Sequence, residues 1–295
     1  MQHLISVQAL AADANADAHA HANANANDTT HTKAIVFDCR FSLMDKQAGR
    51  RAWEAGHIPG ARFADLEQDL SSAPGRGGRH PLPDRDELAA RLRRWGVNND
   101  SHIVCYDQNS GAVAGRFWWL IRWLGHGDVR VLDGGLDAWI AAGQPVDTGA
   151  VAPEAGNFTP RPALTRTVTA DELLDGSQLL DDGQPTTLLD AREAARYRGE
   201  QEPIDPVAGH IPGAISAPFA DNLAAGRFKS PDALRARFEA LGVDDSDAVA
   251  CYCGSGVTAT HNILALLVAG YPEPALYPGS WSEWIVDPDR PVVKA

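Results

Sequence analysis

The chain has 295 residues, of which 44% are hydrophobic and 22% are charged, as is typical of a globular protein with about two domains. Its formal net charge of −13 disfavours binding to nucleic acid or to anionic membrane surfaces, which require clustered Lys and Arg. No apolar stretch approaches the ~20 residues of a membrane helix, the first residues lack a secretory signal, and four cysteines are too few for a disulfide framework. We therefore expect a reducing, cytoplasmic setting in which the thiols stay free.

Residues 11–32 differ in composition from the rest of the chain. They are rich in Ala, Asn, Asp and His and contain almost no large apolar side chain, so they cannot bury enough surface to fold alone. We expect a mobile, low-complexity surface insertion. Its histidines could bind a metal weakly, but no second ligand type stands at a fixed spacing, and a solvated loop is the preferred interpretation. These histidines are His19, His21 and His31.

Beyond this insertion, short apolar runs that end in a polar residue alternate with amphipathic stretches. Such runs are typical of buried parallel strands, and the stretches between them are typical of crossover helices. The predicted strands are Ala34–Phe37, Ile103–Tyr106, Thr187–Leu189 and Ala248–Tyr252, and the predicted helices include Asp86–Trp95, Pro231–Leu241 and Ile263–Ala269. The pattern predicts the α/β class, with mainly parallel sheets flanked by helices and ligands bound beyond the carboxyl ends of the strands.

An internal repeat divides the chain into two similar halves. Gly56–Ala61 reads Gly-His-Ile-Pro-Gly-Ala and recurs letter for letter at Gly209–Ala214. A spacing of about 150 residues is far longer than a solenoid repeat and indicates a duplicated domain. Further matching pairs are Asp38 with Asp190, Arg40 with Arg192, Cys105 with Cys251, and Trp139 with Trp284.

The Pro-rich run 144–162 is the predicted linker, because proline resists both helix and sheet. We therefore predict a first domain at residues 1–143 and a second at residues 163–295. Features that both halves share are expected to serve the scaffold. On that reasoning His57 and His210 are hydrogen-bonded loop residues rather than bases. Trp139, Trp281 and Trp284 are expected to be core or interdomain anchors.

The halves differ most after the last of the predicted strands in each. The second half carries Cys253 followed by a loop of small residues and an apolar helix, whereas the first half carries Asp107 at the matching position. Gly254 and Gly256 permit backbone conformations that turn successive N–H groups inward to form an anion-binding nest. The N-terminus of the helix adds partial positive charge. Such a site favours the thiolate of Cys253 over its thiol.

Taken together, the paired Gly-His-Ile-Pro-Gly-Ala motifs, the loop Cys253–Thr258 and the closing segment Gly279–Trp284 resemble the tandem-rhodanese sulfurtransferases over nearly the whole chain. The loop is similar to that of the 3-mercaptopyruvate sulfurtransferases, whereas the thiosulfate enzymes tend to place a basic pair after the cysteine. The resemblance implies an inactive first domain and a catalytic second domain without cofactor or metal. Sulfur then passes from a small anionic donor through a Cys253 persulfide to cyanide, a thiol or thioredoxin, and pyruvate is released.

A carboxylate donor requires a cation near the thiol. Arg196 stands only in the second half, since Ala52 occupies the matching position, and the resemblance implies that Arg196 binds the substrate carboxylate. Arg192 has a counterpart in Arg40, so a structural ion pair competes with a place in the substrate site. The remaining expected substrate-binding residues lie on the loop and are Gly254, Gly256, Val257 and Thr258.

The resemblance also implies a proton relay of serine, histidine and carboxylate. Ser255 fits the serine, His80 fits the histidine, and Glu67 fits the carboxylate, with Asp65 as its alternative. One departure from the family pattern concerns substrate recognition. These enzymes commonly carry a second arginine shortly before the second Gly-His-Ile-Pro-Gly motif, and Pro203–Ala208 contains none.

Three other interpretations compete with this one. A thiosulfate sulfurtransferase is the first, because the second arginine is missing. A non-catalytic module that carries persulfide or binds a partner is the second, although Cys253 and Arg196 weigh against it. A phosphatase of the same fold would need an arginine six positions after the cysteine, and Ala259 stands there. Cys251 is expected to pack in the core rather than to act on Cys253.

Overall fold

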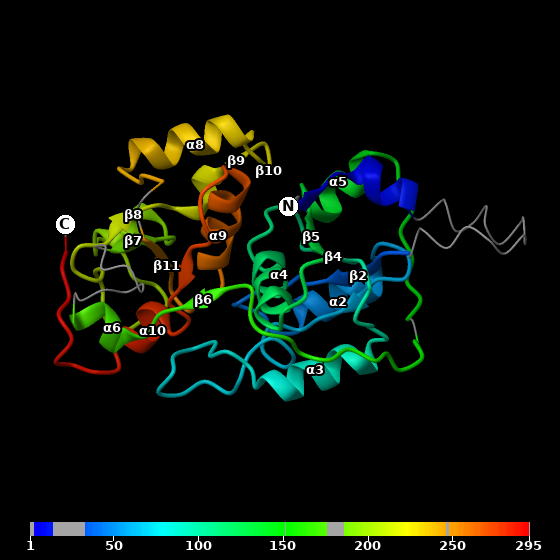
Figure 1. The fold of residues 1–295 in the computed structure, drawn as a ribbon, viewed down its shortest axis with the longest axis horizontal. Coiled ribbons are helices and arrows are strands. Elements are labelled where there is room, and N and C mark those ends of the chain that lie inside the picture. Colours follow the sequence, from blue (N-terminus) through cyan, green and yellow to red (C-terminus); the bar gives the residue numbers. More distant parts are fainter. Residues whose placement is uncertain (1–2, 14–32, 151, 176–185, 246–247, 295) are drawn as a thin grey trace, which may run out of the picture. The chain divides into compact units, whose positions relative to one another are not determined.

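The computed structural model describes residues 3–13, 33–150, 152–175, 186–245 and 248–294 (Figure 1). The chain forms two compact units. Unit 1 comprises Met1–Leu70 and Asp84–Leu164, and unit 2 comprises Ser71–Pro83 and Thr165–Ala295. The segment Ser71–Pro83 therefore packs with unit 2, although its place in the sequence lies within the first repeat. Residues 144–162, which the sequence suggests as a linker, belong to unit 1.

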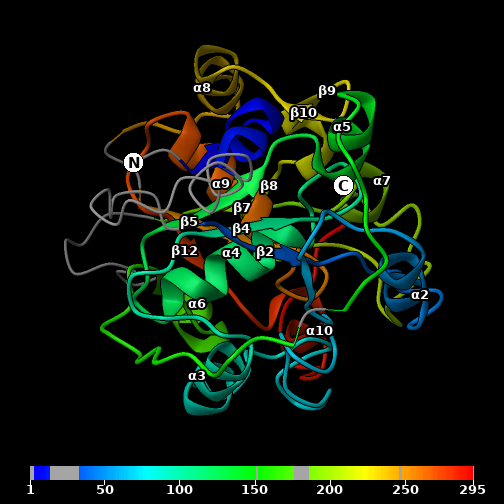
Figure 2. The same ribbon diagram turned by 90° about the vertical axis from the view of Figure 1, so that its right-hand side faces the viewer.

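Unit 1 is built on a sheet of five parallel strands in the order β1-β5-β4-β2-β3. The strands are β1 Leu4–Ile5, β2 Ile35–Asp38, β3 Arg62–Phe63, β4 Ile103–Tyr106 and β5 Val129–Leu132. The helices are α2 Ala48–Ala55, α3 Arg85–Arg94, α4 Ala114–Trp123 and α5 Gly135–Ala141, and residues 7–13 are also helical. Helices α3 and α4 lie on one face of the sheet, and α5 with residues 7–13 lies on the other (Figures 1 and 2).

Unit 2 repeats this plan with a second sheet of five parallel strands in the order β6-β12-β11-β7-β8. The strands are β6 Arg166–Thr167, β7 Thr186–Asp190, β8 Ile215–Ser216, β11 Ala248–Tyr252 and β12 Ala275–Leu276, and a hairpin adds β9 Leu223–Ala224 and β10 Arg227–Phe228. The helices are α6 Ala170–Asp175, α7 Ala194–Tyr197, α8 Pro231–Ala240, α9 Ala259–Val268 and α10 Ser280–Trp284, with the 3₁₀ helix η1 Phe219–Asn222. Helices α8 and α9 cover one face of the sheet, and α6 and α10 cover the other (Figure 2).

An equivalent buried ion pair lies at the end of β2 in unit 1 and at the end of β7 in unit 2. In unit 1, Arg40 Nη2 lies 2.7 Å from Asp38 Oδ2 and donates to the carbonyl of Gly56. In unit 2, Arg192 Nη2 lies 2.6 Å from Asp190 Oδ2 and donates to the carbonyl of Gly209. Because a buried charge is tolerated only when it is paired and hydrogen-bonded, these pairs are structural parts of the repeated scaffold.

The paired histidines also serve the scaffold, as predicted. His57 Nδ1 lies 2.7 Å from the carbonyl oxygen of Trp53, and the ring stacks on the indole. His210 Nδ1 lies 2.8 Å from the carbonyl oxygen of Tyr197, and its ring stacks on the phenol. Both side chains are buried. The tryptophans Trp139, Trp281 and Trp284 are likewise buried in the cores.

The expected insertion at residues 11–32 begins later than the composition suggests. Residues 7–13 form a helix, and Leu10 and Ala11 pack into the core of unit 1. Alanine and leucine favour helix, so the low-complexity start continues the preceding apolar pattern. Residues 14–32, with all three of the histidines considered above, lie outside the described residues. Within the described part of the chain, no helix has the length and apolar character needed to cross a bilayer.

Candidate active site

Cys253 lies directly after β11, at the carboxyl end of the central strand of unit 2. The residue is only 2% exposed. Its N–H donates to Ser280 Oγ at 3.1 Å, and its carbonyl accepts from the N–H of Trp281 at 3.0 Å. Two contacts from the start of α10 therefore fix the backbone of the cysteine. The sequence did not reveal Ser280, whose φ of +54° is rare for a residue with a side chain.

The loop after Cys253 requires glycine at two positions for different reasons. Gly256 has a φ of +73°, and a Cβ on it would lie 2.2 Å from the carbonyl oxygen of Pro278. Gly254 has no such backbone requirement, but a Cβ on it would lie 3.1 Å from Arg79 Nη2. Gly254 therefore leaves room for arginine side chains, and Gly256 lets the loop turn against the backbone of Pro278.

The backbone of this loop offers donors to an anion. Within the described part of the chain, the N–H groups of Ser255, Val257 and Thr258 have no hydrogen-bond acceptor. Val257 is buried, and Thr258 immediately precedes α9, so these amides stand at the positive end of a helix. The nest that the glycines predict is consistent with this geometry.

Ser255 and His80 lie together, as the resemblance implies. Ser255 Oγ is 2.8 Å from His80 Nδ1, and both side chains are buried. His80 reaches the loop because Ser71–Pro83 packs with unit 2. Glu67 belongs to unit 1, where its carboxylate lies 3.0 Å from Lys46 Nζ. Its place in the relay remains a prediction, as does that of Asp65, whose Oδ1 accepts from the N–H groups of Glu67 and Gln68.

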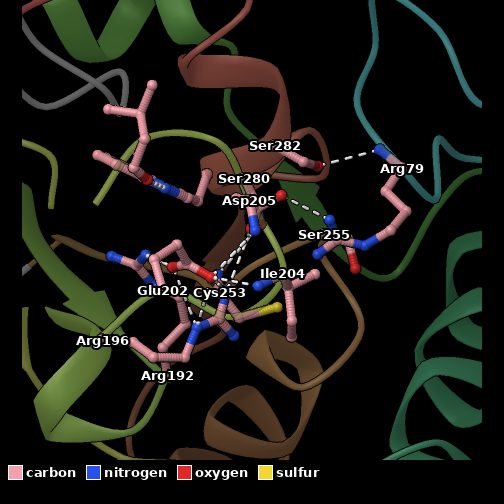
Figure 3. Close-up of polar contacts among 12 residues, drawn as sticks. Arg79, Arg192, Arg196, Glu202, Ile204, Asp205, Cys253, Ser255, Ser280 and Ser282 are labelled. Atoms are coloured by element: carbon pink, nitrogen blue, oxygen red, sulfur yellow. Dashed lines mark hydrogen bonds and ion pairs between the residues drawn. The ribbon is translucent and has the colours of Figure 1, made fainter. Parts of the chain in front are cut away.

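Arg196 extends from α7 into a cluster of carboxylates (Figure 3). Its Nε donates to both carboxylate oxygens of Glu202 at 3.1 Å. Its Nη2 donates to Glu202 Oε1 at 2.7 Å and to Asp205 Oδ2 at 3.1 Å. Burial alone would raise the pKa of Glu202. The hydrogen bonds and charge of Arg196, together with the hydrogen bonds from the N–H groups of Asp205 and Ile204, outweigh that effect and hold the pKa below its ordinary value.

Arg192 uses its donors within the scaffold. Besides its pair with Asp190, its Nη1 lies 3.5 Å from Glu202 Oε2, and its side chain is only 1% exposed. Buried opposite charges raise the pKa of Arg192 despite the cost of desolvation, so the guanidinium remains charged. The ion pair accounts for this residue, and direct contact with a substrate remains an untested prediction.

Comparisons with known proteins place this geometry in a family. The model of the rhodanese-like domain matches residues 18–142 and again residues 170–287. The chain belongs to the rhodanese family. The chain is 53% identical to a "Probable 3-mercaptopyruvate sulfurtransferase" of Pseudomonas aeruginosa over 264 residues, which cover 88% of this chain and 91% of the relative.

Two further relatives are similar to the chain over most of its length. The thiosulfate sulfurtransferase of Mus musculus is 35% identical over 257 residues, with 84% of each chain covered. The crystal structure of SseA from Escherichia coli, described as a 3-mercaptopyruvate sulfotransferase, superposes with a TM-score of 0.79 at 30% identity and covers 96% of this chain and 100% of its own. The chain is therefore a sulfurtransferase.

A second arginine in the site, Arg79, was not predicted from the sequence. Arg79 Nη1 lies 2.6 Å from Asp205 Oδ1, and its backbone N–H donates to Ser282 Oγ at 3.0 Å (Figure 3). The only sequence signal for it is its position directly before His80. Because Asp205 follows more than a hundred residues later, no local pattern links the two.

Cys251, the second cysteine near the site, has the surroundings of a core residue. Cys251 is fully buried within β11, and burial, with the nearby Cys253, raises the pKa of its thiol far above the ordinary value. Cys105 on β4 occupies the equivalent position in unit 1, and burial raises the pKa of that thiol as well. These surroundings favour the packing role that the repeat predicts for Cys251.

Proposed function

We propose that this sulfurtransferase takes sulfur from 3-mercaptopyruvate, carries it as a persulfide on Cys253, and passes it to a thiophilic acceptor such as cyanide, a small thiol or thioredoxin. The contact between Ser255 Oγ and His80 Nδ1, two residues from the nucleophile, carries the proposal. The names of the Pseudomonas relative and of E. coli SseA support the same donor. A cytoplasmic location, where thiol acceptors are reduced, fits this chemistry.

The first half-reaction balances without a cofactor. The Cys253 thiolate supplies the electron pair of the new S–S bond, and the C–S bond of 3-mercaptopyruvate breaks with its electron pair going to carbon. The leaving group is the enolate of pyruvate, which the neighbouring ketone stabilises. The proton of the donor thiol moves to the enolate carbon, so that the products are pyruvate and the Cys253 persulfide anion. Attack of the acceptor on the outer sulfur then restores the thiolate.

The proton explains why a hydroxyl and an imidazole beside Cys253 favour this donor. 3-Mercaptopyruvate carries a thiol proton that must leave sulfur and reach carbon. Ser255 and His80 are within hydrogen-bond distance of each other, and a hydroxyl next to an imidazole can pass a proton from one group to the other. Thiosulfate is fully ionised at neutral pH and needs no such transfer.

Two measurements test the proposal. Intact mass should increase by one sulfur atom when the protein meets 3-mercaptopyruvate without acceptor; Cys253→Ser should abolish the gain, whereas Cys251→Ala should retain it. The kcat/KM for 3-mercaptopyruvate should exceed that for thiosulfate by at least about tenfold. Faster turnover of thiosulfate would overturn the donor assignment. No sulfur gain with either donor would instead favour a non-catalytic module.

A further inference from the structure

A single carboxylate connects two arginines beside the Cys253 loop. Asp205 Oδ1 accepts from Arg79 Nη1 at 2.6 Å, and Asp205 Oδ2 accepts from Arg196 Nη2 at 3.1 Å. The Asp205 side chain is only 4% exposed, whereas those of Arg79 and Arg196 are 22% and 13% exposed. The carboxylate is therefore the buried part of this cluster, and the guanidinium groups are the part that solvent or a ligand can reach.

The two arginines keep donors that the protein does not use. Among the described residues, Arg79 Nη2 and Nε and Arg196 Nη1 have no hydrogen-bond acceptor. A Cβ on Gly254 would lie 3.1 Å from Arg79 Nη2 and 3.6 Å from Arg196 Nη1, so both groups approach the same point next to the nucleophile. Figure 3 shows the two side chains reaching the loop from opposite sides.

The charges around this point are balanced before any ligand binds. Arg79, Arg192 and Arg196 face three carboxylates, those of Asp190, Glu202 and Asp205. The scaffold pair occupies Arg192, which leaves the outer edges of Arg79 and Arg196 to an anion. Asp205 and Glu202 already hold these guanidinium groups in place. Binding of a ligand carboxylate therefore costs little additional side-chain entropy of the arginines.

We propose that Arg79 is a second binding residue for the carboxylate of the sulfur donor, and that Asp205 is a positioning residue that orients Arg79 and Arg196 toward it. This inference rests on the proposed function for the identity of the ligand, a 2-oxo acid. Two planar guanidinium groups around one carboxylate give the directional, charge-assisted hydrogen bonds that suit such a ligand. Arg79 thereby supplies the cation that is absent from Pro203–Ala208.

The test uses the full chain with Arg79→Gln and, as the matched control, Arg76→Gln, an exposed arginine of the same segment. Pyruvate is the probe, and its protection of Cys253 against iodoacetamide is followed by peptide mass spectrometry. Loss of hydrogen bonds to a charged group should weaken protection by roughly 10- to 100-fold in Arg79→Gln. Arg76→Gln should match the unaltered protein, and Arg79→Lys, which keeps the charge without the planar group, should fall between them.

Unchanged protection in Arg79→Gln overturns the proposal, and so does the absence of protection in the unaltered protein. This measurement needs no turnover, so a carboxylate site can be established even when 3-mercaptopyruvate proves to be the wrong donor. Failure of the proposed function has a different signature, namely protection by pyruvate without sulfur transfer from 3-mercaptopyruvate.

A second donor separates recognition from a merely structural role. 1-Mercaptopropan-2-one retains the mercaptoketone of 3-mercaptopyruvate and lacks its carboxylate. Arg79→Gln should raise KM for 3-mercaptopyruvate roughly 10- to 100-fold while leaving kcat/KM for the uncharged donor within about twofold. An equal loss of kcat/KM with both donors would mean that Arg79 only holds the segment Ser71–Pro83 in place. This outcome would also overturn the proposal.

Discussion

The loops that follow the central strands of the two units differ in what occupies their amides. In unit 1, the carboxylate of Asp107 lies where unit 2 has the Cys253 side chain, and four backbone N–H groups donate to it. These donors are Ser110 at 3.1 Å, Gly111 at 2.9 Å, Val113 at 2.9 Å and Ala114 at 3.3 Å. Unit 1 therefore fills its own anion-binding loop with a fixed carboxylate. The amide nest belongs to the repeated fold, and chemistry depends on which side chain stands at the strand end.

A pocket beside Asp107 also shows how unit 1 differs from unit 2. The pocket has a volume of about 290 Å³ and is lined by Arg40 and Ala52 among others. Ala52 stands where unit 2 has Arg196, so the first unit keeps space at this position and lacks the cation. A hollow and a nest alone do not make the site; unit 2 adds the thiol, the arginines and the pair of Ser255 with His80.

Giving unit 2 the residue of unit 1 should have the largest effect. Cys253→Asp should reduce sulfur transfer to background and, because the free amides gain a carboxylate, raise the free energy of unfolding by about 1–3 kcal/mol. Turnover and urea denaturation measure the two effects. Cys253→Ser is the control, since it removes the thiol without filling the nest. An aspartate variant that is less stable than the serine variant would show that the two loops are not equivalent.

Removing the carboxylate from unit 1 is the complementary experiment. Asp107→Ala should lower the free energy of unfolding by about 2–4 kcal/mol, because four amides lose a charged acceptor while the side chain is buried. Asp137→Asn is the control: Asp137 is exposed and accepts only from the side chains of Gln108 and Asn109 in this loop. Sulfur transfer by properly folded protein should persist. A loss no larger than that of the control would argue against a filled nest in unit 1.

Much of this comparison could be predicted from the sequence, because duplication supplies an internal control. The apolar runs predicted two strands with their observed bounds, since the expected Ile103–Tyr106 and Ala248–Tyr252 are β4 and β11. The other two predicted strands correspond to β2 and β7, each of which ends one residue later than expected. The pairing of Ser255 with His80 came from resemblance. Periodicity predicts elements well since it reflects burial along one strand or helix.

Residues that meet through long-range packing were harder to predict. Arg79 approaches Asp205 only because Ser71–Pro83 packs with unit 2, and no local pattern reveals this. Ser280 was hidden for another reason: its role depends on a positive φ that sequence patterns assign to glycine. The residue of unit 1 that corresponds to Ser280 is Gly135, whose φ is +56°.

This pair allows a test of strain beside the nucleophile. Ser280→Gly relieves the left-handed backbone but removes the acceptor of the Cys253 N–H, so stability should change by less than about 1 kcal/mol. Ser280→Ala removes the same acceptor and keeps the strain, and it should be less stable than Ser280→Gly by about 1 kcal/mol. Thermal and urea unfolding of both variants measure the difference. Equal stabilities would mean that the positive φ costs nothing here.

The smallest expected effect concerns Glu202, which sits beside Arg192, whereas the described residues of unit 1 show no comparable carboxylate beside Arg40. The pKa of Glu202 lies below its ordinary value of 4.5 because, although burial raises it, Arg196 and the backbone N–H groups of Asp205 and Ile204 together lower it by more. The unfolded chain therefore binds this proton more readily than the folded one. The stabilisation is present above pH 4.5 and is lost as pH falls through the lower folded-state pKa. The free energies of unfolding of Glu202→Gln and of the unaltered protein, measured by urea denaturation, should accordingly differ at pH 7, and the difference should shrink as pH falls below 4.5. A difference that stays constant as pH falls would show that the ionised carboxylate is not the stabilising form.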